Sequence, residues 1–262
     1  MHIDPNPLAH AASNNDLRLP AFGGEFQPGL YRPPQRKIAN PAPLGLSCFA
    51  LTTFILSIIN IGARGVHHPN IVVAAALAYG GLVQLLAGMW EFVAGNTFGA
   101  TALSSYGGFW ISFGIILTPG GFHIVETLEA KGPDQFYNSF GFFLIAWFIF
   151  TTMLTILTLR STLAFFLLFF LLDIAFACLA AGYFNYDAKG PNESCIKAGG
   201  YFGIIASFLA WYNAFAGMAD DSNSFFTVPV MHFPWSEKGR ERQAAIRNDM
   251  ENGAPNRAMK TE

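Results

Sequence analysis

Six apolar stretches, each about twenty residues long, constrain the fold of this chain more than any other feature of its sequence. A helix of that length crosses the hydrocarbon core of a bilayer, and lipid offers the polypeptide backbone no hydrogen-bond partners. The sequence therefore predicts an all-α membrane protein with six transmembrane helices. The predicted spans are residues 42–63, 70–94, 97–118, 137–159, 161–184 and 195–218.

The composition agrees with this class and excludes others. Charged residues make up 12% of the 262 residues, about half the share that soluble domains carry. The net charge of −2 gives nucleic acid no electrostatic reason to bind. The three cysteines, Cys48, Cys178 and Cys195, are too few and too scattered for a metal cluster or a disulfide framework. Because no nucleotide-binding or zinc-protease motif occurs, we expect no enzyme activity, no catalytic residues, no metal and no cofactor.

The distribution of polar residues predicts three regions. Residues 1–39 are rich in proline and lack apolar periodicity, which indicates a cytoplasmic tail that is mostly disordered. Residues 40–219 would form the membrane domain, and residues 220–262 a second cytoplasmic tail. With both termini inside, the inner segments carry eleven Lys and Arg residues and the outer loops carry four, which is the positive-inside pattern. The sequon at Asn192 falls in a predicted outer loop, so Asn192 is a candidate for N-glycosylation.

Three of the predicted spans begin on the same side of the membrane with a capping sequence. These sequences are Asn40-Pro41, Asn96-Thr97 and Ser161-Thr162. Asparagine is a good N-cap, and proline fits the first position of a helix because its missing N–H would be unpaired there. The positive end of a helix attracts small anions. Asn40, Asn96 and Thr97 are therefore candidates for anion binding.

A family resemblance runs through the same region, from about residue 40 to residue 217. The motifs that carry it are Asn40-Pro41-Ala42-Pro43-Leu44-Gly45-Leu46, Tyr79-Gly80-Gly81, Gln84, Gly88, Glu91, Gly95-Asn96-Thr97-Phe98-Gly99 and Ser105-Tyr106-Gly107-Gly108-Phe109-Trp110. On these motifs the chain resembles the acetate uptake transporter family, which includes bacterial succinate–acetate permeases and fungal acetate and ammonia-export-type membrane proteins. The resemblance implies a homo-hexamer in which the six helices of each protomer surround a pore of its own.

The resemblance also implies a hydrophobic constriction formed by Phe49, Tyr106 and Leu172. At about 1.5 Å per residue, these side chains lie about 10, 13 and 16 Å inside their spans, measured from one side of the membrane. That depth is consistent with one ring near the middle of the bilayer. Taken alone, a Phe or Leu in a membrane helix is more often a packing or lipid contact.

Polar residues within the spans are further candidates. Gln84, Thr52, Thr53 and Ser105 could donate hydrogen bonds to a carboxylate, although Ser and Thr often bond only their own helix backbone. Gln84 is the strongest of these candidates because a buried amide needs partners.

Two acids are candidates for proton coupling. Asp173 lies near the centre of the fifth span, where a charge is costly, so it should face protein or water, or be protonated. A proton relay and a buried structural carboxyl are equally good interpretations of Asp173. Glu91 lies one turn from the end of the second span, where reaching the interface or capping a neighbour is the likelier role.

The sequence thus predicts a plasma-membrane transporter of acetate and related short-chain monocarboxylates, working as a proton symporter or as an anion channel. Two alternatives stay open. One is an exporter of ammonia or ammonium, and the other is a membrane sensor that binds acetate without flux.

Overall fold

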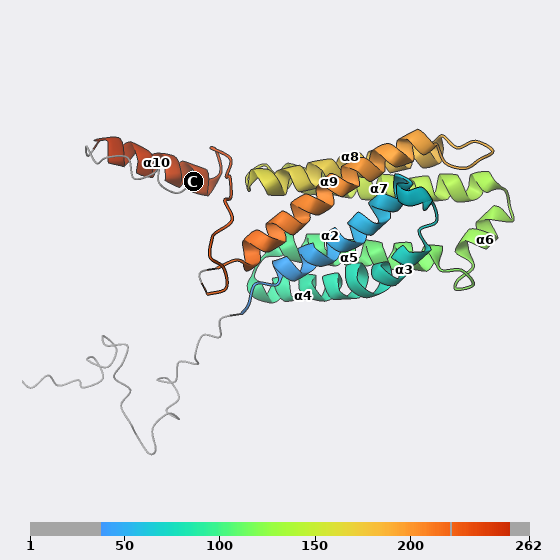
Figure 1. Ribbon diagram of the computed structural model, residues 1–262, viewed down its shortest axis with the longest axis horizontal. Coiled ribbons are helices and arrows are strands. Elements are labelled where there is room, and N and C mark those ends of the chain that lie inside the picture. Colours follow the sequence, from blue (N-terminus) through green and yellow to red (C-terminus); the bar gives the residue numbers. More distant parts are fainter. Residues whose placement is uncertain (1–37, 221, 252–262) are drawn as a thin grey trace, which may run out of the picture. The chain divides into compact units, whose positions relative to one another are not determined.

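The computed structural model describes residues 38–220 and 222–251. The tail predicted for residues 1–39 lies outside the described residues except for Ile38 and Ala39, as does the end of the second tail from residue 252. Six described helical segments are long and apolar enough to cross a membrane, which confirms the predicted six-span all-α architecture. The spanning helices are α2 (Ala42–Asn60), α3 and α4 (Asn70–Leu77 and Gln84–Ala94), α5 (Thr97–Leu117), α7 (Pro133–Thr158), α8 (Leu163–Phe184) and α9 (Glu193–Met218) (Figure 1).

Two boundaries differ from the predicted ones by more than two residues. The first span ends at Asn60 rather than at residue 63, because Gly62 takes a left-handed conformation with φ of 72°. The fourth span begins at Pro133 rather than at residue 137, since proline is accepted at the first position of a helix. Two helices of the described chain were not predicted, α6 (Ile124–Glu129) and α10 (Glu237–Glu251).

The spanning helices pack in two groups of three. In the first group, α2 contacts α4, and α4 packs on α5; in the second, α8 lies against both α7 and α9. The groups meet where α2 packs along α9, and again where aromatic rings join α5 to α7. Phe109 stacks on Phe143 with ring centroids 5.7 Å apart, and its edge meets Trp147 at 5.1 Å. The helices therefore close around an interior rich in aromatic side chains.

The second span is interrupted by a wider turn. Ala78–Val83 form a π-helical segment between α3 and α4, so one residue more than usual separates each N–H from its acceptor. Gly80 lies in this segment against α2, and a Cβ there would stand only 2.5 Å from Thr52 Oγ1. The π segment ends directly before Gln84 and thus sets the direction in which that side chain points.

Small residues bring the helices together inside the protomer. A Cβ on Gly88 would stand 2.5 Å from the backbone nitrogen of Ser104 in α5, and one on Gly200 2.9 Å from the carbonyl of Ser57 in α2. Gly95, seven residues after Gly88, makes no such contact. Gly95 ends α4 in a left-handed conformation with φ of 80°, and no atom lies within 4 Å of where its Cβ would be.

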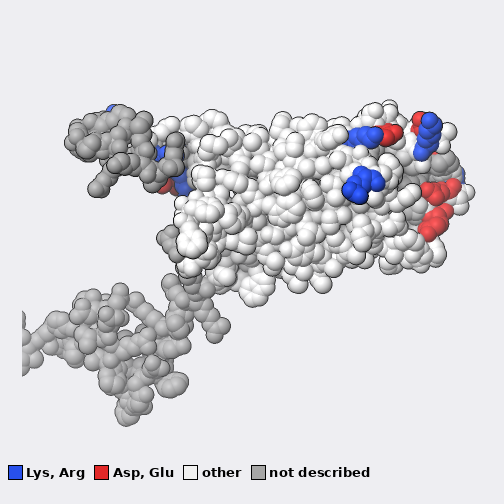
Figure 2. All heavy atoms as spheres, viewed as in Figure 1, with Lys and Arg blue, Asp and Glu red and all other residues white. Residues whose placement is uncertain are grey.

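The outside of the bundle is apolar along its length. Figure 2 shows the charged side chains of this face gathered at its ends, with a broad uncharged stretch between them. Exposed residues of α7 include Ile149, Met153, Ile156 and Leu157. Such a surface is suited to lipid and not to water, so the protein is an integral membrane protein.

The chain after α9 is not wholly solvated, contrary to the interpretation of this tail from its polar sequence. Trp235 Nε1 donates to the Leu159 carbonyl at 2.7 Å, and the Leu163 N–H donates to the Met231 carbonyl at 2.9 Å. Phe233 stacks on Trp235 with centroids 4.8 Å apart. Met231, Phe233 and Trp235 belong to an apolar stretch, residues 225–235, that is too short to span a membrane, so the sequence did not reveal this docking onto the α7–α8 turn.

Two adjacent glycines test the packing of α4 against α5. A Cβ on Gly107 would stand 2.8 Å from the backbone nitrogen of Leu85, whereas one on Gly108 would meet nothing within 4 Å. We expect Gly107→Ala to destabilise the protein by about 1–3 kcal/mol, because two backbones must separate. Gly108→Ala should be neutral or stabilise by up to about 1 kcal/mol through helix propensity. Thermal unfolding of the purified variants in one detergent measures both, and equal melting temperatures would contradict this account of the contact.

Candidate functional site

A cavity of about 170 Å³, called here the narrow cavity, lies among α2, α4, α5 and α8. Its walls include Phe49, Gln84, Asn96, Tyr106 and Leu172, and other positions supply apolar side chains. Pockets for drug-sized ligands measure about 300–1,000 Å³, so the narrow cavity suits a solute of only a few heavy atoms.

The three residues predicted to form a constriction lie together on this cavity. The rings of Phe49 and Tyr106 have centroids 5.7 Å apart, and Leu172 lines the same space from α8. All three are buried, with exposed fractions of 3–6%. Tyr106 also contacts Phe169, which the sequence did not single out, at a centroid distance of 6.3 Å. A ring of this composition makes an anion shed water before it passes.

Gln84 is the polar group of the narrow cavity. Its side chain has no exposed surface, and neither its Oε1 nor its Nε2 has a hydrogen-bond partner in the protein. An unpartnered buried amide costs about 1–3 kcal/mol, so few survive in folded proteins without a reason. The position of Gln84 on the wall of the cavity supplies one, because a solute there can bond the amide.

The first turns of three helices border the narrow cavity through Ala42 of α2, Asn96 and Gly99 of α5, and Phe165 of α8. Asn96 caps α5 as predicted, with its Oδ1 accepting from the Gly99 N–H at 3.0 Å. Thr162 caps α8 in the same way, accepting from the Phe165 N–H at 3.3 Å. The convergence of the three helix ends follows the predicted arrangement.

Asn40 lies one residue before the position predicted for it. Pro41 occupies the N-cap of α2, and the Asn40 Oδ1 accepts instead from the Ala42 N–H at 3.1 Å. Asn40 lines a separate cavity of about 240 Å³ with Thr162 and Asn213. At α8 the Leu163 N–H is taken by the Met231 carbonyl, so this helix end offers fewer free donors than the sequence indicated.

Glu91 is buried beside the narrow cavity. Its exposed fraction is 1%, which excludes the interpretation that it reaches the membrane interface. Asn96 Nδ2 donates to Glu91 Oε2 at 2.5 Å, while Oε1 has no hydrogen-bond partner. A carboxyl group therefore lies directly behind Asn96, which borders the cavity.

The other polar candidates lie away from the narrow cavity. Thr52 donates to the Cys48 carbonyl of its own helix at 2.9 Å, and the Thr53 hydroxyl is buried without a partner. Thr97 is exposed at the start of α5, and Ser105 is half-buried. None of these four side chains lines it.

Asp173 contacts Thr152 of α7 and does not line the narrow cavity. Thr152 Oγ1 is 3.0 Å from each of its carboxyl oxygens and 3.0 Å from the Phe148 carbonyl. A hydroxyl has one hydrogen to donate. Thr152 therefore shares its one hydrogen among the two Asp173 oxygens and the carbonyl of its own helix, which ties Asp173 to α7.

Thr151 is a site residue that the sequence did not reveal. Its Oγ1 lies 2.8 Å from the Tyr106 hydroxyl, and its side chain has no exposed surface. The two residues are 45 positions apart, on different helices. A local sequence pattern does not reveal how these two helices are rotated against each other.

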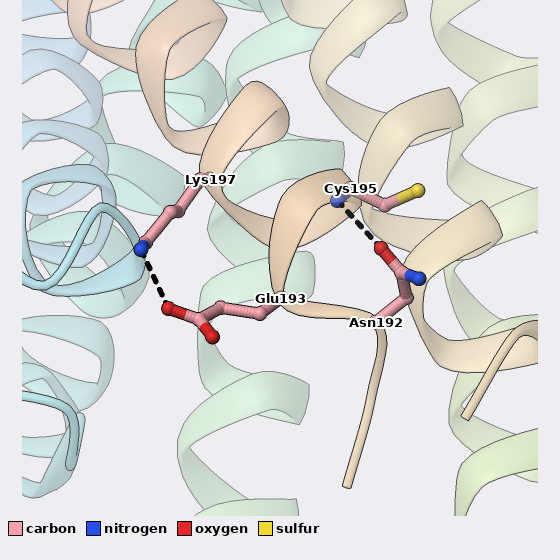
Figure 3. Close-up of polar contacts among 4 residues, drawn as sticks. All are labelled: Asn192, Glu193, Cys195 and Lys197. Carbon is pink, nitrogen blue, oxygen red and sulfur yellow. Dashed lines mark hydrogen bonds and ion pairs between the residues drawn. The ribbon is translucent and has the colours of Figure 1, made fainter. Parts of the chain in front are cut away.

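A second cavity of about 860 Å³, called here the wide cavity, opens at the opposite end of the bundle. Tyr106 lines the narrow cavity, whereas Phe109, one turn further along α5, lines the wide one. Aromatic side chains therefore separate the two spaces. Asn192, the glycosylation candidate, lies at the wide cavity and caps α9 by accepting from the Cys195 N–H at 3.1 Å, next to the Glu193–Lys197 ion pair (Figure 3).

Two cavities in line through an apolar six-helix bundle, divided by an aromatic constriction, define a membrane transport protein. The chain belongs to the GPR1/FUN34/yaaH family, whose model matches residues 22–235. The predicted family is thereby confirmed, over a longer stretch than the motifs had covered.

Individual relatives agree with this assignment. The chain is 65% identical over 241 residues to Acetate permease A of Emericella nidulans, covering 90% of this chain and 80% of the relative. It is 49% identical over 218 residues to Ammonia transport outward protein 2 of Saccharomyces cerevisiae, covering 83% and 75% of the two chains. The solved structure of the bacterial acetate channel SatP matches with a TM-score of 0.62 at 33% identity, covering 74% of this chain and 99% of that one.

Gln84 offers a test in which stability and flux separate. We expect Gln84→Leu to be at least as stable as the wild type, because it removes an unpartnered buried amide. Solute flux should fall by about tenfold or more, the value of one hydrogen bond to a charged group. Melting temperature and tracer uptake are measured on the same preparation.

Thr53→Val is the matched control for this substitution. It also removes an unpartnered buried polar atom, but one that does not line the narrow cavity. Its flux should equal that of the wild type. Loss of flux in both variants to the same degree would show that Gln84 has no special part in the pathway.

Proposed function

We propose that this protein carries acetate and related short-chain monocarboxylates across a membrane without ATP. The observation that carries the proposal is the unpartnered amide of Gln84 on the wall of a small cavity whose other walls are mainly apolar. The amide offers two N–H donors to a carboxylate, and the apolar walls accept a methyl group. The names of Acetate permease A and of the acetate channel SatP support the same substrate.

The barrier to other solutes follows from the constriction. A carboxylate that passes Phe49, Tyr106 and Leu172 exchanges its water shell for one amide and the ends of α2 and α5. A dicarboxylate has two charges to desolvate and greater length, so the same ring opposes it more strongly. Neutral hydrogen-bond donors hold the anion less strongly than a fixed cation would, so the anion can also leave the cavity.

Export of ammonia or ammonium is the second candidate. The relative named Ammonia transport outward protein 2 favours it, as does one feature of the site. Phe49, Phe98, Phe165 and Phe169 line the narrow cavity, and aromatic faces attract cations. Acetate remains the better fit, because Gln84 and the helix ends of α2 and α5 present N–H donors to the same space.

Flux into lipid vesicles that contain the purified protein separates the candidates. We expect uptake of labelled acetate that unlabelled propionate inhibits, with little uptake of labelled methylammonium. Protein-free vesicles and vesicles with Gln84→Leu are the controls, since the weak acid also crosses bare lipid in its protonated form. Methylammonium uptake without acetate uptake would establish the exporter, and acetate binding without any flux would establish a sensor.

Proton coupling, if present, should depend on Glu91 and not on Asp173. Glu91 contacts Asn96 at the narrow cavity, whereas Asp173 bonds Thr152 and lines neither the narrow nor the wide cavity. We infer that Asp173 is a structural group and that Glu91 is the one able to exchange a proton with the pathway.

The paired variants Glu91→Gln and Asp173→Asn test this assignment. Both keep the size of the side chain and remove its titration. We expect acetate flux to lose its dependence on pH in Glu91→Gln and to keep it in Asp173→Asn, measured in vesicles between pH 5 and pH 8. The reverse result would make Asp173 the coupling group, and unchanged profiles in both would favour an uncoupled channel.

The assembly and placement of the protein belong to the same proposal. We infer a homo-hexamer with one pathway in each protomer, in the plasma membrane, with both termini in the cytoplasm. The eleven-to-four division of basic residues supports this orientation. Residues 1–39 and 220–262 would then be cytoplasmic tails on either side of the membrane domain 40–219, and Asn192 would lie outside the cell.

A further inference from the structure

Most buried hydroxyl groups of the spanning helices bond a carbonyl of their own helix. Thr52 donates to Cys48, Thr155 to Thr151 and Ser207 to Gly203, at 2.8–2.9 Å. This is the ordinary use of a hydroxyl in a membrane helix, because it satisfies the group without a partner elsewhere.

Thr151 departs from that pattern. Its Oγ1 lies 2.8 Å from the hydroxyl of Tyr106 on α5, and it has no bond to a carbonyl of α7. Within residues 38–220 and 222–251, this is the one hydrogen bond between two side chains that joins the first three spans to the last three. Both residues are almost fully enclosed, with exposed fractions of 0% and 3%.

The hydrogen bond acts on the ring that narrows the pathway. Aromatic contacts surround Tyr106, including Phe49 at 5.7 Å, Trp147 at 6.0 Å and Phe169 at 6.3 Å between centroids. Aromatic pairs adopt offset-stacked, tilted and edge-to-face arrangements over a range of centroid distances of about 4.5–7 Å, so these contacts alone do not fix one position of the ring. A hydrogen bond is directional, so Thr151 fixes how far the phenol ring extends from α5 toward Leu172.

Thr151 does not itself line the narrow cavity. The Tyr106 hydroxyl is already engaged, so the passing solute meets mainly the face of the ring. We infer that Thr151 is a positioning residue that sets the width of the constriction through the Tyr106 hydroxyl, and thereby the preference for acetate over larger acids. This inference rests on the proposed transport of monocarboxylates.

The neighbourhood of Thr151 supplies a matched control on the same helix. Thr155 lies one turn further along α7, is also buried, and bonds the Thr151 carbonyl without contacting Tyr106. Replacing either threonine by valine makes the same chemical change in the same helix. Only the change at Thr151 releases the Tyr106 ring.

The experiment compares labelled acetate and labelled lactate uptake in vesicles that contain the full chain. We expect Thr151→Val to lower the acetate-to-lactate ratio by about three- to tenfold, as the loss of one hydrogen bond allows. Thr151→Ser, which keeps the hydroxyl, should restore the wild-type ratio, and Thr155→Val should leave it unchanged. A purely structural defect would instead lower both fluxes together.

A double-mutant cycle shows whether Thr151 acts through Tyr106. In a Tyr106→Phe background, Thr151→Val should change the ratio no further, because the hydrogen bond is already absent. The double variant leaves no lone buried hydroxyl, so it should fold even if Thr151→Val alone does not. If Thr151→Val alone does not fold, Thr151→Ala is combined with Tyr106→Phe as well. The acetate-to-lactate ratio of that double variant is then compared with the ratio of Tyr106→Phe alone.

The two possible failures are distinct. Independent effects of Thr151→Val and Tyr106→Phe on the ratio, or no effect of Thr151→Val at all, would overturn the positioning role while acetate flux persists. Absence of acetate and lactate flux in the wild-type protein would overturn the proposed function itself, and the claim about selectivity with it.

Discussion

The hydrocarbon core of the membrane is the constraint on which the rest of this structure depends. Lipid gives polar groups no hydrogen-bond partners, so leaving one unsatisfied in a span is costly. Helices satisfy the backbone, and hydroxyls such as that of Thr52 bond their own helix. The amide of Gln84 remains without a protein partner, and it lies on the wall of the narrow cavity. The same constraint that shapes the helices therefore marks the pathway.

The pathway has different chemistry at its two ends. On one side, the first turns of α2, α5 and α8 border a small space, with the Glu91 carboxyl held behind Asn96. On the other, the wide cavity has a rim that contains both Lys197 and Glu193, so its charges largely compensate. Aromatic side chains divide the two spaces. A structure of this kind lets a small solute exchange its water shell gradually and leaves no strong charge to retain it.

Cohesion of the bundle comes from two kinds of contact. Close backbone approach, as at Gly107 and Leu85, holds α4 and α5 together and needs residues without side chains. Across the pathway, α5 and α7 are joined by aromatic rings and by one hydrogen bond between Tyr106 and Thr151. The first kind makes rigid groups of helices. The two groups also approach closely where α2 meets α9, as at Gly200 and Ser57, so it is the α5–α7 side of the constriction that depends on a few side chains.

The sequence by itself determined the number and type of the spans, the caps at Asn96 and Thr162, and the depth of Phe49, Tyr106 and Leu172, because these follow from local composition and the helical rise. Only the tertiary structure decided the rest. It turned Gln84 toward the cavity after a π segment, placed Asp173 against Thr152, and paired Tyr106 with Thr151. Those outcomes depend on the rotation of each helix against its neighbours, and that rotation is set by packing between distant residues, which no local pattern records.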